Sequence, residues 1–148
     1  MHFTKVWLDN DMVELQVDVS DGTSLFSNRI YVGHATLAQT VNDLEAFKDK
    51  LYGGLLDVRF GEFGPEYASG ALHARFHFPN PGKLFITSKQ QSEFRDFSVG
   101  KVANEAIIHL VSEPVLLDNF IAEMKGLKAS LRDEAHLEAV KWFDHART

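Results

Sequence analysis

Hydrophobic and polar residues alternate one by one in two separate segments of the chain, residues 13–19 and residues 72–78. Successive side chains of a β-strand point to opposite faces of its sheet, so each segment predicts a strand with one apolar and one polar face. Shorter apolar segments bounded by turn residues predict five further strands, at residues 3–8, 25–32, 55–60, 83–88 and 102–111. The last of these is apolar on much of both faces, which predicts a central position in the sheet.

The period of the pattern changes between residues 37 and 52. Apolar residues recur there at spacings of four, three, three and four, which places them on one face of a helix: Leu37, Val41, Leu44, Phe47 and Leu51. Thr36 and Gln39 have the spacing of a capping box at its start. Gly53 and Gly54 predict its end.

A second helical pattern follows the last strand. Ser112-Glu113-Pro114 is a suitable start, because proline is well tolerated in the first turn of a helix. The apolar stripe of this helix includes Leu117, Met124, Leu127 and Leu131. Gly126 and residues 130–134 leave two alternatives open: one long helix, or two helices of which the second carries Leu137, Val140 and Phe143.

The order of strands, helix, strands and helix predicts an α+β fold, with a mostly antiparallel sheet. One mid-chain helix and one or two C-terminal helices would pack on one face of that sheet. No repeat and no linker divides the chain, so residues 1–148 are expected to form a single domain. The polar sides of the strands would then face solvent or a partner.

Composition and charge narrow the range of functions. The chain has no cysteine, which excludes disulfides, thiol catalysis and cysteine-ligated zinc. Its net charge is −6 and no dense lysine–arginine cluster is present, so nucleic acid is not an expected partner. The acidic charge favours a basic protein partner or serves solubility alone, and solubility is the preferred interpretation of the charge by itself. No segment has the pattern of a signal peptide or a membrane span, and we expect a cytoplasmic protein that does not bind membranes.

One predicted strand carries the best candidate for a binding surface. His73, Arg75 and His77 lie on the same face of the strand, with alternate residues about 6.5–7 Å apart. Asp57 and Arg59 join them if the preceding strand pairs alongside. Glu105 and His109 of the last strand are further candidates for the same face, provided that their register agrees.

The two histidines of this strand present imidazoles that a metal ion or an acid–base reaction can use. Arg75 lies between them and would repel a cation, and the spacing fixes no third ligand. A solvated sheet face, on which histidine and arginine cover apolar surface, is therefore the preferred interpretation. We assign no metal, no cofactor and no catalytic residue, and an enzyme is the less favoured class.

A glycine-rich connection at residues 61–70 is a second candidate. It lacks the Gly-Lys-Ser/Thr of a phosphate-binding loop, and no Gly-x-Ser-x-Gly nucleophile motif is present. Glu62, Glu66 and Tyr67 are expected to lie on an exposed loop, where binding residues are common. The alternative is a long hairpin whose glycines serve only the backbone.

The order of elements also resembles that of small bacterial proteins whose described relatives are immunity proteins, which neutralise toxins. The likeness rests on the helix at residues 37–51 with its Leu44-x-x-Phe47, the strands that follow it, and the Ser112-Glu113-Pro114 start of the closing helix. The resemblance implies a binding protein and carries over no catalytic residue.

Two functional hypotheses follow. The first is a small binding protein, of the type of an immunity inhibitor, that uses an acidic surface against a basic toxin. The second is a metal- or small-ligand-binding protein, or an enzyme, that uses the face of His73, Arg75 and His77. A homodimer formed through a sheet edge or through Trp142 and Phe143 is a third possibility.

Overall fold

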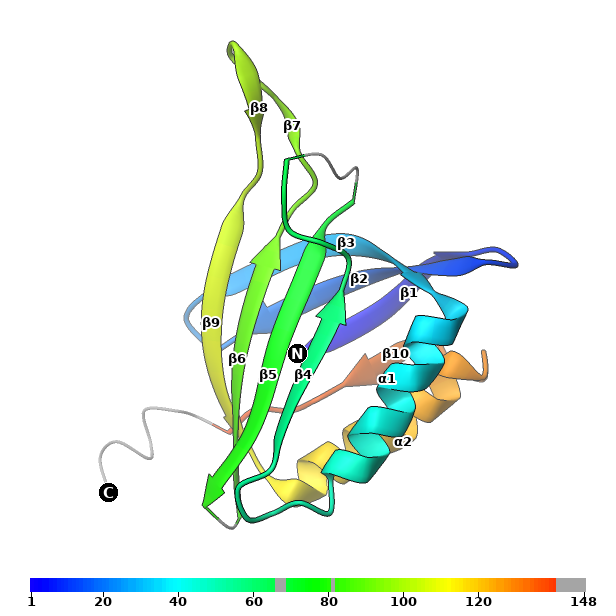
Figure 1. Ribbon diagram of the computed structural model, residues 1–148, viewed down its shortest axis with the longest axis vertical. Coiled ribbons are helices and arrows are strands. Elements are labelled where there is room, and N and C mark those ends of the chain that lie inside the picture. The colour runs from blue at the N-terminus through cyan, green and yellow to red at the C-terminus, as the bar shows by residue number, and fades with distance from the viewer. Residues whose placement is uncertain (66–68, 81, 141–148) are drawn as a thin grey trace.

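The computed structural model describes residues 1–65, 69–80 and 82–140. Within them lie ten strands and two helices, arranged as two four-stranded antiparallel sheets, one separate hairpin and a pair of helices (Figure 1). The elements in chain order are β1 (His2–Leu8), β2 (Met12–Ser20), β3 (Leu25–Gly33), α1 (His34–Phe47), β4 (Leu55–Phe60), β5 (Ala71–Asn80), β6 (Lys83–Gln91), β7 (Arg95–Phe97), β8 (Gly100–Val102), β9 (Glu105–Ser112), α2 (Pro114–Lys128) and β10 (Glu134–His136). The fold is α+β, as the alternating and helical periods predict.

The first sheet has the strand order β10-β1-β2-β3. Strands β1, β2 and β3 form the meander that their turn residues favour, and β10 adds to the free edge of β1 by pairing Ala135 with Phe3. In β2 the apolar residues are fully buried while the polar residues between them lie on the outer face. The strict alternation of this strand therefore corresponds to one face on the core and one open face.

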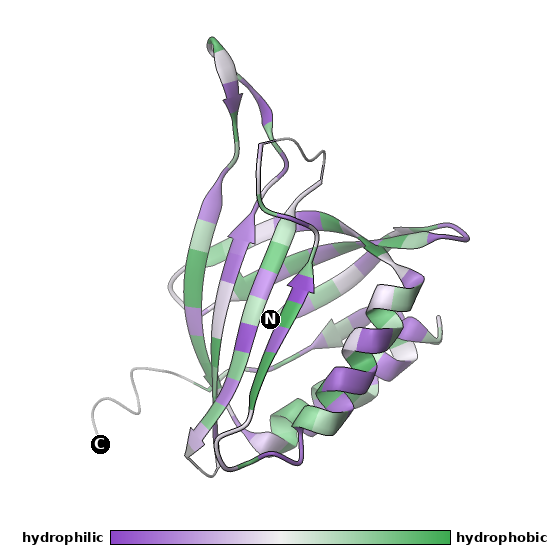
Figure 2. Ribbon diagram, in the orientation of Figure 1, coloured by the Kyte–Doolittle hydropathy of each residue, from purple (hydrophilic) through white to green (hydrophobic). Residues whose placement is uncertain are grey.

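The second sheet has the strand order β4-β5-β6-β9. Hydrophobic and hydrophilic residues alternate along β5 in Figure 2, and Leu72, Ala74, Phe76 and Phe78 are buried on its inner face. The polar residues between them lie on the outer face. Residues 72–78 are thus a strand with the predicted polarity.

The core lies between the inner faces of the two sheets and the two helices. Phe3 of the first sheet packs edge-on against Phe60 of the second, with ring centroids 6.0 Å apart. Phe47 of α1 stacks on Phe78 at 5.0 Å. Figure 1 shows α1 and α2 side by side along the same end of both sheets. Lys125 Nζ of α2 forms an ion pair with Glu45 of α1 at 3.0 Å. Each buried leucine or phenylalanine contributes about 2 kcal/mol through removal of apolar surface from water.

Two buried amides connect the sheets. Gln90 of β6 donates through Nε2 to Asn28 Oδ1 of β3 at 2.9 Å and to the carbonyl of Val17 at 3.2 Å. Asn28 Nδ2 in turn donates to the carbonyl of Gln91 at 2.8 Å. These bonds hold the edge of the first sheet against the second. Separating the sheet edges would leave buried amide groups without a hydrogen-bond partner, which costs free energy.

The mid-chain helix both starts and ends earlier than predicted: it ends at Phe47 and not at Gly53, so that Leu51 lies after the helix. Strand β3 continues directly into α1, and Gly33 is the N-cap with no side-chain hydrogen bond. The capping box predicted for Thr36 and Gln39 is wrong, because both residues already lie inside the helix. Gln39 Nε2 instead donates to Asp43 Oδ1 one turn later, at 2.8 Å.

The structure corrects two further predictions near the C-terminus. Residues 134–136 form the short strand β10 rather than a second helix, because β1 offers an unpaired edge. Residues 102–111 are not one central strand. The chain leaves β8 after Val102, and β9 lies at the edge of the second sheet. Trp142 and Phe143 lie outside the described residues. Neither helix in the described part of the chain is long and apolar enough to cross a membrane.

Candidate functional site

Five of the predicted site residues lie together on the outer face of the second sheet. The antiparallel register pairs Asp57 with Arg75 and Arg59 with His73, while His77 follows on the same face of β5. The condition set by the sequence, that the preceding strand pairs alongside, is met. Asp57 and Arg59 also border a shallow groove of about 390 Å³ between β4 and α1.

Asp57 is the centre of this group. Arg75 donates to it through Nε at 2.9 Å and through Nη2 at 3.2 Å, and His73 Nε2 lies 2.9 Å from Asp57 Oδ1. The bonds from Arg75, and to a smaller extent those from His73, lower the pKa of Asp57 from 3.8 to about 2, although partial burial acts in the opposite direction. The carboxylate is therefore ionised and already neutralised by its neighbours.

Glu105 and His109 share this outer face but do not join the group. Strand β6 separates β9 from β5, so that His109 lies opposite Thr87 and Glu105 opposite Gln91. His109 Nδ1 is 3.1 Å from Thr87 Oγ1, and Glu105 accepts a hydrogen bond of 2.6 Å from Gln91. The two residues are thus held by their own cross-strand neighbours.

This arrangement is unfavourable for a cation. Arg75 lies between His73 and His77 on β5, and its guanidinium binds Asp57, the carboxylate that His73 also contacts. Nowhere in the described ranges do three or more His, Asp or Glu side chains form a group able to hold a metal ion. What the group does is fix the side chains of β4 and β5 on an ordered, charged surface.

The glycine-rich connection holds its own backbone close to the first sheet. Gly61 has a φ of 68°, and a Cβ there would clash with the carbonyl of Gly70. Gly70 donates through its N–H to the carbonyl of Arg29 in β3 at 3.1 Å. These glycines therefore have a backbone role. Glu62 is exposed, whereas Glu66 and Tyr67 lie outside the described residues.

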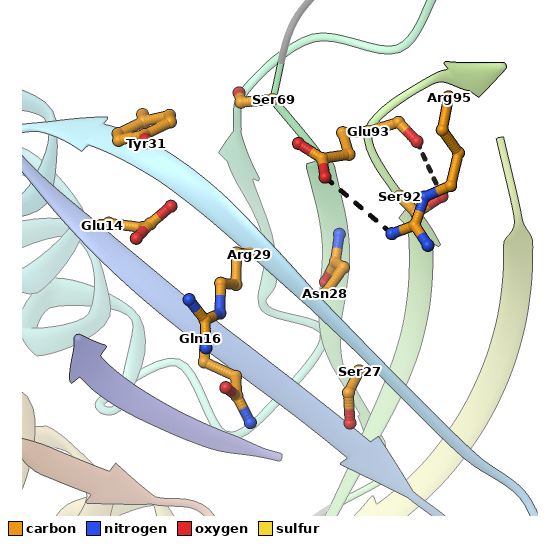
Figure 3. Close-up of a pocket in the computed structure, with 10 residues that line it drawn as sticks. All are labelled: Glu14, Gln16, Ser27, Asn28, Arg29, Tyr31, Ser69, Ser92, Glu93 and Arg95. Atoms are coloured by element: carbon orange, nitrogen blue, oxygen red, sulfur yellow. Dashed lines mark hydrogen bonds and ion pairs between the residues drawn. The ribbon is translucent and has the colours of Figure 1, made fainter. Parts of the chain in front are cut away.

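A larger groove, of about 640 Å³, lies between the outer face of the first sheet and the segments that follow β6, and no sequence pattern predicted it. Glu14, Gln16, Arg29 and Tyr31 line it from β2 and β3. Ser69 and Glu93 line it from loops, and Arg95 lines it from the start of β7 (Figure 3). It combines carboxylates, guanidinium groups and an aromatic ring in one place.

The charged side chains of this groove shift the pKa of Tyr31. The charge of Glu14 is the first cause that raises the pKa of Tyr31, followed by desolvation, a hydrogen bond with Glu14 and the charge of Glu93, while Arg29 opposes them. The carboxylates of Glu14 and Glu93 point toward each other across the groove in Figure 3. Trp7 packs edge-on against Tyr31, with ring centroids 6.1 Å apart, and both rings remain about half exposed.

The β7–β8 hairpin adjoins this groove and projects beyond both sheets (Figure 1). Its strands pair only with each other, through Arg95 with Val102 and Phe97 with Gly100, and Ser98 adopts a φ of 56° in the turn. Phe97 is 69% exposed and Val99 is fully exposed. Because Arg95 belongs to both features, hairpin and groove form one continuous surface, the groove–hairpin surface: Trp7, Glu14, Tyr31, Glu93, Arg95, Phe97 and Val99.

Sequence reasoning missed this surface for two reasons. The tip Ser98-Val99-Gly100 is a recognisable turn between short β-forming segments, but it lies in the polar stretch of residues 89–101, which favoured no element. The groove itself has no local signal, because Glu14, Tyr31 and Glu93 are far apart in the chain. Comparisons of this chain with protein-family models, with curated proteins and with solved structures give no match.

Proposed function

We propose that this chain is a small cytoplasmic binding protein that inhibits a basic protein partner, in the manner of a bacterial immunity protein. The observation that carries the proposal is the projecting β7–β8 hairpin, which holds Phe97 and Val99 in solvent away from the core. Apolar side chains on a protruding element gain nothing for folding. They gain free energy when a partner covers them, at about 25 cal/mol per Å² of apolar surface.

The groove beside the hairpin supports a protein partner over a small apolar ligand. Its lining is polar and charged, and it is open rather than enclosed. Small-molecule sites are mostly apolar cavities with a few polar groups, whereas the rims of protein interfaces are polar and wet. A protein that covers the hairpin tip would place its own polar groups over Glu14, Glu93 and Arg95.

The net charge of −6 supports a basic partner, because opposite charge accelerates encounter between two proteins. The alternative function, a metal or small ligand on the face of His73, Arg75 and His77, has less support. Asp57 is already engaged by Arg75 and His73, and binding there would first have to break those bonds.

The partner can be sought among the proteins encoded next to the gene for this chain. Each neighbouring product is expressed in bacteria with and without this chain, and growth is measured together with affinity by isothermal titration calorimetry. We expect one product to arrest growth alone and to be tolerated when this chain is present. If every neighbouring product is harmless or remains toxic in its presence, the immunity-type role is wrong.

The hairpin tip can be tested with the same partner. We expect the double variant Phe97→Ser, Val99→Ser to weaken binding at least about tenfold, because two exposed apolar anchors are lost. Its thermal midpoint should stay unchanged, since neither side chain contributes to the core. Val115→Ser, an exposed apolar position on α2, serves as the control and should bind normally. Full affinity of the tip variant would contradict the proposed surface.

A further inference from the structure

Resting on the proposed function, we infer that Glu14, Tyr31 and Glu93 form a receptor for one arginine side chain of the protein partner. Glu14 lies directly opposite Tyr31 in the pairing of β2 with β3. Glu93 reaches the same place from the connection between β6 and β7. All three side chains line the 640 Å³ groove, Glu14 and Tyr31 on one side and Glu93 on the side of Ser92 and Arg95 (Figure 3), and the charges of both carboxylates raise the pKa of Tyr31.

The two carboxylates are available for a ligand. Glu14 forms no ion pair with a lysine or arginine in the described part of the chain, and the ion pair of Glu93 with Arg95 spans 3.9 Å between largely exposed side chains. Asp57 provides the contrast, since two donors of Arg75 occupy its oxygens at 2.9 and 3.2 Å. A cation placed between Glu14 and Glu93 would relieve the repulsion between two like charges that share one groove.

An aromatic wall adds a second kind of attraction. Tyr31 and the edge-on Trp7 leave about half of each side chain in solvent beside the carboxylates. A guanidinium stacks on such a ring and at the same time donates hydrogen bonds within its own plane. Lysine offers a single compact charge without a planar face that stacks on the ring, so the aromatic wall favours arginine.

Two cations of the protein itself limit where the ligand can lie. Arg29 lies on the Gln16 side of the groove and Arg95 at the base of the hairpin (Figure 3). Both repel an incoming guanidinium, and Arg29 opposes the effect of the carboxylates on Tyr31. The cation is thereby confined to the side of the groove at which Tyr31 and Glu14 lie (Figure 3).

The receptor can be tested without the partner by NMR titration of this chain with N-acetylargininamide. N-acetylcitrullinamide is the matched control, because it has nearly the same shape and no charge. We expect weak binding, with a dissociation constant on the order of millimolar, and shifts concentrated on Tyr31, the Trp7 indole and the backbone of Glu14 and Glu93. Glu14→Gln and Glu93→Gln should each weaken it about fivefold, whereas Asp118→Asn on α2 should not.

Three results would overturn the inference: no localised shifts with the arginine amide, equal shifts with the citrulline amide, or unchanged affinity in both glutamine variants. Equal affinity for N-acetyllysinamide would overturn the choice of guanidinium. The outcome is separable from that of the proposed function. A partner that binds Glu14→Gln as tightly as the natural chain leaves the function intact and removes the receptor. If the chain binds the arginine amide but inhibits no neighbouring product, the receptor stands and the proposed function is wrong.

Discussion

The carboxylates of the two candidate surfaces differ in whether side chains of the protein already bind them. Asp57 gives its oxygens to Arg75 and His73 within the protein, whereas Glu14 and Glu93 face an open groove and an exposed tyrosine. The alternation along β5 predicts which residues share a face with Arg75, and the pairing of β4 with β5 then brings Asp57 to it. The first carboxylate is therefore structural, and the other two are available for recognition.

The stability of the protein should depend on pH through Asp57. The folded-state pKa of about 2 lies below the usual 3.8, so this carboxylate stabilises the fold above pH 4 and loses that contribution as the pH falls from 3.8 toward 2. Because its side chain is 24% exposed, we expect a contribution of only about 1 kcal/mol. Urea unfolding of Asp57→Asn should show a correspondingly smaller loss of stability between pH 4 and pH 2.

Glu62→Gln, which removes an exposed carboxylate, is the control for that experiment. Its unfolding free energy should follow that of the natural chain over the whole pH range. If Asp57→Asn and the natural chain lose stability in parallel as the pH falls, then the bonds from Arg75 and His73 contribute nothing measurable.

Whole elements show where local signals were sufficient. The helix α1 and the strands β2 and β5 could be predicted because their apolar residues follow a single period over seven or more positions. Strand β10 could not, because three residues carry no period and their conformation depends on the open edge of β1. The same holds for β7 and β8, which are three residues each and stabilise only one another.

Strand β10 should contribute to the stability of the first sheet despite its length. Ala135 is fully buried opposite Phe3, and a proline there has no N–H for the ladder and a larger ring in the core. We expect Ala135→Pro to lower the free energy of unfolding by about 3 kcal/mol in chemical denaturation. Ala139→Pro, at an exposed position after the strand, should cost less than about 1 kcal/mol. Equal values for the two variants would show that β10 is dispensable.

The charge of the whole molecule is distributed unevenly. The outer face of the second sheet carries Arg59, Arg75 and Lys89 against Asp57 and Glu105, so the acidic excess does not lie there. If the partner is basic, as proposed, the surface that attracts it is expected elsewhere than on the strand face of His73, Arg75 and His77. The groove supplies two carboxylates, Glu14 and Glu93, to such a partner, but Arg29 and Arg95 balance their charge, so the acidic excess does not lie in this groove either.

Association with a basic partner should weaken as salt rises. With a net charge of −6 the long-range attraction is screened over about 10 Å at 0.1 M salt, so the association rate should fall severalfold between 50 and 300 mM salt while dissociation changes little. Stopped-flow binding at a series of salt concentrations measures both rates. An association rate that is flat across the series would remove the electrostatic part of the proposed function.

The sequence by itself determined the α+β class, the residues that face the core in β2 and β5, and the apolar stripe of α1, because these depend on periods within one segment. Only the tertiary structure decided that the strands divide into two sheets, that β9 lies at an edge and that β10 completes the first sheet. Only it brought Glu14, Tyr31 and Glu93 together. Glu14 and Tyr31 meet across one short hairpin, but Glu93 reaches them from a distant part of the chain, a proximity for which no short segment carries a signal.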